Sequence, residues 1–220
     1  MGAVVLVLGK SGSGKSTSLR NFKRGEIGIF NVLGKPLPFR GGRDLVQVGG
    51  ATYNTILQGL RANEFHAYAV DDSTYLMQNE NFLRARESGY SKYTEMAQHF
   101  QELLLAAAAT DADTIVYLLH HVDENADGSE KVKTIGKMLD EKYCIEGACP
   151  MVLDCRVVDG EHKFVTANDG TNLAKAPMGM LPALMDNDLR AVDTSARDYW
   201  GMAPLTVNER YATAQKGTTE

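Results

Sequence analysis

A glycine-rich loop between an apolar run and a helical stretch constrains the fold of this chain more than any other feature. Residues 3–8 read Ala-Val-Val-Leu-Val-Leu, a run typical of a strand buried on both faces of a parallel sheet. The run ends in the pattern Gly-x4-Gly-Lys-Ser at residues 9–16, and residues 17–22 have helical character. A strand, a glycine loop and a helix in this order predict a P-loop, the phosphate-binding element of many α/β proteins.

The residue types in this loop suit the binding of a phosphate chain. Glycines allow close approach of the backbone, and the N–H groups at a helix N-terminus carry partial positive charge. Lys15 is expected to reach the β and γ phosphates, and Ser16 to bind Mg²⁺ through its hydroxyl. A plain glycine turn is the alternative, which the flanking strand and helix disfavour. The residues expected to contact the nucleotide phosphates are Gly9, Ser11, Gly12, Ser13, Gly14, Lys15, Ser16 and Thr17.

A second apolar segment, residues 65–72, ends in the carboxylates of Asp71 and Asp72. A Mg²⁺ ion on Ser16 needs a second anchor, which a strand ending beside the phosphate loop can supply. We expect Asp71 to be the outer ligand of the ion and Asp72 to orient a water. Either carboxylate fits either role, and Asp72 equally fits a cap for a helix starting near Ser73.

The remaining patterns predict one α/β domain over residues 1–205, with a mostly parallel sheet flanked by helices and a C-terminal β-hairpin. Further strands are expected at residues 26–32 and 114–119, and helices at 52–63, 93–107 and 186–200. The hairpin is expected at residues 150–158 and 161–166, because Asp159-Gly160 between them suits a type I′ turn. Residues 122–133 are expected to form a polar loop, and residues 206–220 a disordered tail.

Histidines follow the strand expected at residues 114–119. His120 and His121 lie where side chains of open α/β sheets project toward a ligand. A histidine there can hydrogen-bond to a γ phosphate, and a metal ligand or an ordinary polar strand end are the alternatives.

The three cysteines, Cys144, Cys149 and Cys155, lack the short paired spacing of zinc sites. Thiols packed near the hairpin are the favoured interpretation. An odd and small number of cysteines indicates a reducing compartment. The apolar runs are far shorter than the roughly 18 residues of a membrane span. We therefore expect a cytoplasmic protein without a membrane segment.

Two cationic stretches are candidates for contact with a polyanion, although the formal net charge of the chain is −5. Cations track phosphates and an aromatic ring can stack on a base, the combination used in sequence-tolerant binding of single strands. Ordinary solvated charged faces are the alternative. The candidate residues are Arg84, Arg86, Tyr90 and Lys92 in the first stretch, and Lys131, Lys133 and Lys137 in the second.

The order of these motifs resembles the ATPase core of the RecA recombinases. More closely, the chain resembles the small phage-encoded RecA-like ATPases of the Sak group, which act as single-strand annealing proteins in phage recombination. The matching phrases extend over nearly the whole chain: Leu8–Ser16, Asn31–Pro38, Leu119–His121, Lys133–Leu139 and Pro177–Met180. The resemblance implies a RecA-like P-loop NTPase core, ATP and Mg²⁺ as cofactors, single-stranded DNA and a single-strand-binding protein as partners, and a homo-oligomeric ring or filament.

The resemblance also implies roles for particular segments. Residues 84–92 and 122–135 would face single-stranded DNA, and His121 would couple the γ phosphate to the second of these segments. Lys175, in the stretch Asn172–Pro177, would complete the nucleotide site of a neighbouring subunit. One departure stands out, because residues 29–33 contain no acid where RecA proteins carry their catalytic glutamate. We therefore expect hydrolysis to be slow or differently arranged.

Taken together, the sequence predicts an ATP-binding and single-stranded-DNA-binding recombination protein of a phage, acting in the bacterial cytoplasm as a DNA-dependent ATPase that promotes annealing or strand exchange. The main alternative is a nucleotide-dependent switch or loader for a replication protein, without useful turnover. A small-molecule phosphotransferase is a third, and it usually needs an arginine-rich lid that does not stand out here.

Overall fold

The sequence motifs follow the C-terminal ends of β-strands, and the sheet places these strand ends side by side. A computed structural model describes residues 1–213, and within them the main sheet has eight strands in the order β10-β9-β8-β1-β5-β4-β2-β3. The strands of this sheet are β1 (Ala3–Leu8), β2 (Gly28–Asn31), β3 (Val46–Gly49), β4 (Ala67–Asp71), β5 (Ile115–His120), β8 (Met151–Val158), β9 (Glu161–Val165) and β10 (Leu184–Asp186). The six from β8 to β3 are parallel, whereas β9 and β10 are antiparallel additions at one edge. The expected α/β fold with a mostly parallel sheet is confirmed.

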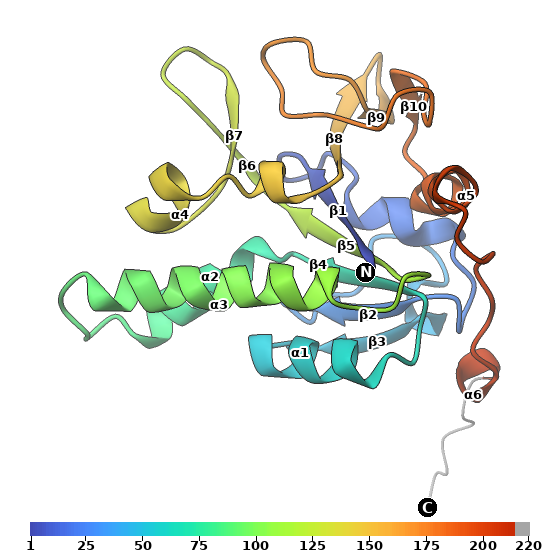
Figure 1. Ribbon diagram of the computed structural model, residues 1–220, viewed down its shortest axis with the longest axis horizontal. Coiled ribbons are helices and arrows are strands. Elements are labelled where there is room, and N and C mark those ends of the chain that lie inside the picture. The colour runs from blue at the N-terminus through green and yellow to red at the C-terminus, as the bar shows by residue number, and fades with distance from the viewer. Residues whose placement is uncertain (214–220) are drawn as a thin grey trace, which may run out of the picture.

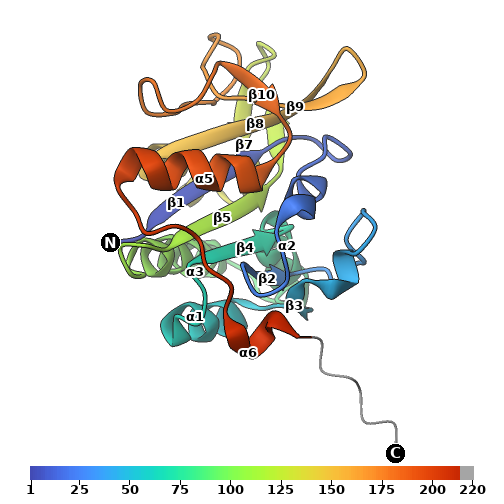
Figure 2. The ribbon, with the colours of Figure 1, turned by 90° about the vertical axis from the view of Figure 1, so that its right-hand side faces the viewer.

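Helices cover both faces of this sheet (Figures 1 and 2). The helices are α1 (Tyr53–Ala62), α2 (Thr74–Leu83), α3 (Ser91–Ala108), α4 (Lys137–Lys142), α5 (Leu189–Trp200) and α6 (Glu209–Ala212), with short 3₁₀ helices at Ser16–Asn21, Gly42–Asp44 and Glu146–Ala148. Helices α1 to α3 bury their apolar faces on one side, and α5 packs with Ser16–Asn21 on the other. Because alternate residues of β1 enter the two clusters, the strand has no polar face, as its sequence indicated. No helix of the described residues is both long and apolar enough to cross a membrane.

Helix α5 is fixed to the sheet by a buried polar network. Asp193 and Arg197 form an ion pair at 2.5 Å, and Tyr117 on β5 donates a hydrogen bond of 2.9 Å to Asp193. Arg197 also donates to the carbonyl of Asp113 at 2.7 Å and to that of His66 at 2.6 Å. The network gives each buried charge a partner of opposite charge and further hydrogen bonds. Burying the same charges in an apolar pocket without these partners would destabilise the fold.

The segment after β5 differs from the polar loop expected at residues 122–133. It is a small antiparallel hairpin of β6 (Val122–Glu124) and β7 (Glu130–Val132), separate from the main sheet. Val122 faces Val132 across the hairpin and both are buried. The expectation of a plain loop is wrong, because strands of three residues are too short to give an alternating pattern.

The chain after β1 also differs from expectation in detail. The helix expected at residues 17–22 is the 3₁₀ helix Ser16–Asn21. Ser18 shares its N–H between the carbonyls of Gly14 and Lys15, and its hydroxyl donates to the Lys15 carbonyl at 2.5 Å. These bonds give the segment the tighter geometry of a 3₁₀ helix. A 3₁₀ helix of six residues is too short to supply the dipole of an α-helix.

The hairpin at the C-terminal side and the last residues complete the fold. Asp159 and Gly160 have φ of 52° and 81°, as a type I′ turn requires, so the expected hairpin of β8 and β9 is confirmed. Residues 206–213 do not match the tail expected from residue 206. They include α6, where Tyr211 donates a hydrogen bond of 2.6 Å to Glu64. The rest of that expected tail, residues 214–220, lies outside the described residues.

Candidate functional site

The glycine loop, residues 9–16, is shaped by positions that accept no side chain. Gly9 has a φ of 154°, and a Cβ there would lie 2.6 Å from the carbonyl oxygen of Cys155. Gly14 has a φ of 104°, and a Cβ there would lie 2.9 Å from the ring of His162. The backbone of this loop therefore runs closer to β8 and β9 than any residue with a side chain could.

Lys15 lies within the loop with its ammonium on backbone carbonyls. It is 6% exposed, and its Nζ donates to the carbonyl of Gly9 at 2.8 Å and to that of Lys10 at 2.9 Å. Burial lowers the pKa of Lys15, against the nearby negative groups that raise it. These carbonyl contacts are ones that a phosphate oxygen can replace, and a buried ammonium gains most from an anionic partner.

A hydrogen bond joins the loop to the end of β4. Ser16 Oγ donates to Asp71 Oδ1 at 2.7 Å, although β5 lies between β1 and β4 in the sheet. Asp71 is buried, which raises its pKa, and the bond from Ser16 lowers it. A hydroxyl beside a buried carboxylate is a pair of hard oxygen donors that fits Mg²⁺. The two residues expected to serve the metal are thus brought together.

Asp72 is held differently from its neighbour. Lys35 Nζ lies 2.7 Å from Asp72 Oδ2, and His121 Nε2 lies 3.8 Å from Oδ1. Burial raises the pKa of Asp72, but His121 and Lys35 outweigh it and leave the pKa below its usual value. Its backbone has a φ of 62°, a strained value for a residue with a side chain. Its carboxylate does not cap α2, which begins at Thr74 and whose N-cap residue, Ser73, makes no side-chain capping bond.

The two histidines after β5 face different surroundings. His120 is fully buried between Ser73 Oγ and the carbonyl of Lys133, each 2.8 Å from a ring nitrogen. Burial lowers its pKa to about 4, so the ring is neutral at pH 7. His121 instead reaches toward Asp72, and its ring packs against Tyr75 with centroids 5.8 Å apart. Of the pair, only His121 lies at the acidic end of β4.

Sequence reasoning missed several residues that hold this site. Cys155 Sγ and His162 Nδ1 both donate to the carbonyl of Ser13, at 3.0 Å and 2.7 Å. Lys35 and Asn31, which reach the acidic edge, belong to the phrase Asn31–Pro38 that carried the family resemblance, so a signal for them was present. Nothing in the pattern around His162 indicated a contact with the glycine loop.

The first cationic stretch is largely engaged within the chain. Arg84 forms ion pairs with Glu80, Glu87 and Glu95 at 2.6–3.0 Å. Lys92 is only 5% exposed, and its ammonium lies 4.9 Å above the ring of Tyr93. Arg86 is exposed, and Tyr90 is 88% exposed. Of the four candidate residues in this stretch, Arg86 and Tyr90 are therefore the two that face outward.

Tyr90 shares a cavity with the second stretch. A hollow of about 670 Å³ is lined by Tyr90, Tyr93, Thr94, Gly136, Lys137, Met138, Glu141 and Lys142. The start of α3 and both ends of α4 thus bring two tyrosines and two lysines to one surface. A sequence separation of more than forty residues gave no indication of this.

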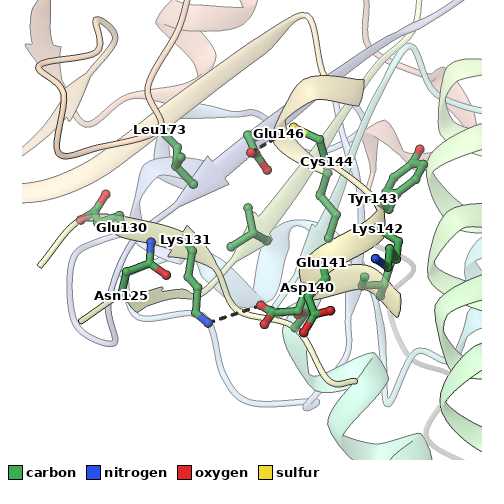
Figure 3. A pocket seen from close by; sticks show the side chains of 14 residues that line it. Asn125, Glu130, Lys131, Asp140, Glu141, Lys142, Tyr143, Cys144, Glu146 and Leu173 are labelled. Carbon is green, nitrogen blue, oxygen red and sulfur yellow. Dashed lines mark hydrogen bonds and ion pairs between the residues drawn. The ribbon is translucent and has the colours of Figure 1, made fainter. Parts of the chain in front are cut away.

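All three lysines of the second stretch lie beside acids, and Lys137 Nζ is 3.9 Å from Glu141 on its own helix. Lys131 Nζ is 3.4 Å from Asp140, and Lys133 Nζ is 3.8 Å from Asp123. Lys131 lines a cavity of about 530 Å³ whose lining also includes Glu130, Asp140, Glu141 and Glu146. Figure 3 shows the ammonium of Lys131 pointing toward Asp140. Four carboxylates against two lysines make this cavity a poor site for a polyanion.

Lys175 lies away from the glycine loop within one chain. Its backbone pairs with Val152 of β8, at 2.8 Å and 2.9 Å, and its charge lowers the pKa of Cys149 against the stronger effect of burial. It forms no hydrogen bond or ion pair with the loop in the described part of the chain.

Comparisons with known proteins add no identification. A scan against protein-family models and a search of curated proteins gave no match to this chain. Among residues 1–213, no group of three or more histidine, cysteine, aspartate or glutamate side chains is arranged to hold a metal ion.

Proposed function

We propose that this chain is a RecA-like P-loop ATPase that binds ATP with Mg²⁺, binds single-stranded DNA and promotes annealing or strand exchange. The glycine loop would hold the phosphate chain, with Lys15 on the β and γ phosphates. Ser16 and Asp71 would hold Mg²⁺, which when bound neutralises charge on those phosphates.

The hydrogen bond between Ser16 and Asp71 carries this proposal. A simple glycine turn gives no reason for its hydroxyl to lie 2.7 Å from a buried carboxylate two strands away. The buried ammonium of Lys15 next to them supplies the charge that a phosphate requires. Three residues predicted from two separate motifs meet at the C-terminal edge of the sheet, where ligands of α/β proteins bind.

The cavity at Tyr90 and Lys137 supports the DNA-binding part of the proposal. The exposed ring of Tyr90 beside lysines provides a surface on which a base can stack while cations meet phosphates. Arg86, exposed on the adjoining segment, adds a further cation. Arg84, Lys92 and Lys131 are committed to contacts within the chain, so we assign DNA binding to the tyrosine cavity.

A second candidate function is a nucleotide-dependent switch or loader without useful turnover. The ion pair of Lys10 with Glu124 favours it, because it joins the glycine loop directly to the hairpin of β6 and β7. A triphosphate next to Lys10 would compete with Glu124 for its ammonium and would free the hairpin.

Steady-state ATP turnover with and without single-stranded DNA separates these functions. The ATPase proposal predicts turnover that DNA stimulates and that Lys15→Ala removes. Tight ATP binding with no turnover, and a change in hairpin protection on ATP binding, would favour the switch. If Lys15→Ala binds and turns over ATP as the parent does, the glycine loop is not the nucleotide site.

A further inference from the structure

Lys35 brings a second ammonium group to the proposed nucleotide site, from a segment outside the glycine loop. Its Nζ lies 2.7 Å from Asp72 Oδ2, just beyond the end of β4. The contact is an ion pair without hydrogen-bond geometry, since Oδ2 has no hydrogen-bond partner among residues 1–213. The side chain of Lys35 is 59% exposed and that of Asp72 only 7%. A buried carboxylate thus holds an ammonium that is open to water on its other side.

The turn after β2 fixes the backbone of Lys35 at this place. Gly34 has a φ of 66°, a left-handed value that glycine adopts without strain, and its N–H donates to the carbonyl of Asn31 at 3.2 Å. Asn31 Nδ2 donates in turn to the carbonyl of Lys35 at 2.6 Å. Pro36 follows and favours an extended backbone at Lys35. The backbone is therefore held, whereas the four-carbon side chain remains free to turn toward a ligand.

The charge of Lys35 acts on the residues that would hold ATP and Mg²⁺. Burial raises the pKa of Asp71, and the hydrogen bond from Ser16 and the charge of Lys35 lower it. Burial lowers the pKa of Lys15, and the charge of Lys35 lowers it further. The contact with Asp72 raises the pKa of Lys35 itself, so its ammonium is charged at pH 7. Lys35 therefore lies within electrostatic reach of both halves of the proposed site.

We propose that Lys35 contacts the γ phosphate of ATP bound to its own chain and stabilises the negative charge that develops as the phosphate leaves ADP. The inference rests on the proposed ATPase function. It assigns to Lys35 the charge that the family resemblance would take from Lys175 of a neighbouring subunit. An ammonium has three N–H donors, so Lys35 can bind a phosphate oxygen while Asp72 still holds it. Asp72 is then a positioning residue that touches no reacting atom.

Lys35 would act in hydrolysis by its charge and not as an acid or a base. A water oxygen forms a bond to the γ phosphorus while the bond to the bridging oxygen breaks, and ADP leaves with that electron pair. A proton of the water passes to an oxygen of the released phosphate. Lys35 keeps its own protons throughout, and Asp72 holds it in place before ATP binds. Charges placed in advance in this way account for much of the catalysis of phosphoryl transfer.

Substitution of Lys35 in the full chain tests this role. Lys35→Ala should slow single-turnover ATP hydrolysis by roughly 100- to 1,000-fold, the cost of removing one group that stabilises developing charge. Binding of ADP with aluminium fluoride, a mimic of the transition state, should weaken in parallel, and ATP affinity should change far less. Lys35→Arg, which keeps the charge, should recover most of the lost rate. Lys163→Ala is the matched control and should hydrolyse ATP at the parent rate, because Lys163 also lies 2.7 Å from an aspartate, Asp186, but on the antiparallel strands β9 and β10.

Mixing two impaired variants tests whether Lys35 acts within its own chain. In an equimolar mixture of Lys35→Ala and Lys15→Ala, no single chain carries both lysines. Action within one chain predicts that the mixture hydrolyses ATP no faster than Lys35→Ala alone. A site shared between subunits would combine Lys15 of one chain with Lys35 of the next, and the resulting gain in rate would overturn the inference.

The remaining outcomes separate this inference from the function on which it rests. Hydrolysis by Lys35→Ala at the parent rate would overturn the inference, as would a Lys35→Arg variant as slow as Lys35→Ala. Loss of ATP affinity and of hydrolysis by the same factor in Lys35→Ala would also overturn it, because the lysine would then bind ground state and transition state alike. Failure of the proposed function has a different signature, namely a parent protein that binds no ATP, or a Lys15→Ala variant that binds it normally.

Discussion

The C-terminal edge of the sheet and the two cationic stretches both contain charged side chains, but those at the edge are buried and most of those in the stretches are open to water. At the edge, Lys15 is buried on the carbonyls of Gly9 and Lys10 in its own loop, and Asp71 is buried against Ser16, which comes from a separate motif. In the stretches, Arg84 pairs with acids within eleven positions of it, and Lys131 with an acid nine positions away. Buried polar groups that are hydrogen-bonded have one geometry, whereas ion pairs open to water contribute about 0–1 kcal/mol and exchange partners readily.

This difference in burial determines whether the side chains of each region are already in position to bind a ligand. A buried ammonium without an anion is costly, so the site at the edge is organised for a ligand before one arrives. The exposed cations have alternative partners inside the chain, and a polyanion must compete with them. We therefore expect substitutions at the edge to have large and specific effects, and substitutions in the stretches to have small effects that depend on salt.

The largest effect is expected at the buried ammonium. Lys15→Ala should weaken ATP binding by about 2–5 kcal/mol, the range found when one member of a buried charge pair is removed. Isothermal titration at low and high salt measures it. A matched change in the stretches, Arg86→Ala, should leave ATP affinity unaltered. If Arg86→Ala weakened ATP binding as much as Lys15→Ala does, the distinction between the two regions would be wrong.

The buried His120 predicts how the stability of the edge depends on pH. Its pKa is about 4 in the folded protein against 6.5 unfolded, so the unfolded state binds the proton more readily. Its contribution is complete at pH 7 and is lost as the pH falls from 6.5 to 4, by about 3 kcal/mol in total. Asp154, whose burial raises its pKa to about 6, has the opposite trend, since its ionisation destabilises the fold as the pH rises.

Denaturant unfolding of the parent and of His120→Asn between pH 4 and 7 isolates the histidine. The difference in unfolding free energy between the two proteins should shrink toward acid pH. A difference independent of pH would mean that His120 is accessible to water and not part of a buried edge.

The neighbouring aspartates should respond differently to loss of charge. Asp71→Asn should weaken Mg²⁺-dependent ATP binding by about 1.5–3 kcal/mol, because a charged acceptor next to Ser16 is lost. Asp72→Asn should leave ATP binding intact and reduce turnover, because Lys35 is then released from its ion pair. Titrations with ATP in Mg²⁺ and in EDTA compare the two. Equal effects of both changes on Mg²⁺-dependent binding would contradict the separate roles.

The exposed tyrosine provides the corresponding test in the stretches. Tyr90→Ala should weaken binding of single-stranded DNA by about 1–3 kcal/mol, the value of one stacked base. The slope of log affinity against log salt should hardly change, because lost stacking releases no counterions. Fluorescence anisotropy with a labelled oligonucleotide at several salt concentrations measures both quantities. A reduced slope with unchanged affinity in 50 mM salt would argue that Tyr90 does not stack.

The smallest effect separates exposed cations from buried ones within one stretch. Arg86→Ala should reduce the salt slope by about 0.7, the value of one phosphate contact on a single strand. Lys92→Met should leave the slope unchanged, because the ammonium of Lys92 is buried over Tyr93. If Lys92→Met lowers the slope as much as Arg86→Ala does, Lys92 contacts DNA as the sequence predicted, and its burial does not keep it from the phosphates.

How far the sequence predicted these regions follows from the range of the interactions. The glycine loop and Asp71 could be found because each depends on a local pattern, a spacing of glycines or the end of an apolar strand. The pairing of Ser16 with Asp71 was expected only from chemistry, and the strand order was not predicted at all. Burial of Lys92 and the capture of Asp72 by Lys35 depend on contacts between separate segments, which no local pattern encodes.

The central claim is that the glycine loop and the end of β4 form one Mg²⁺–ATP site. A double-mutant cycle with Ser16→Ala, Asp71→Asn and the combined variant, measured as ATP affinity in the presence of Mg²⁺, tests it most directly. If the two residues act on one ion, their effects are not additive, and the coupling should reach about 0.5–3 kcal/mol and vanish in EDTA. Additive losses in Mg²⁺, or the same coupling in EDTA, would contradict the account.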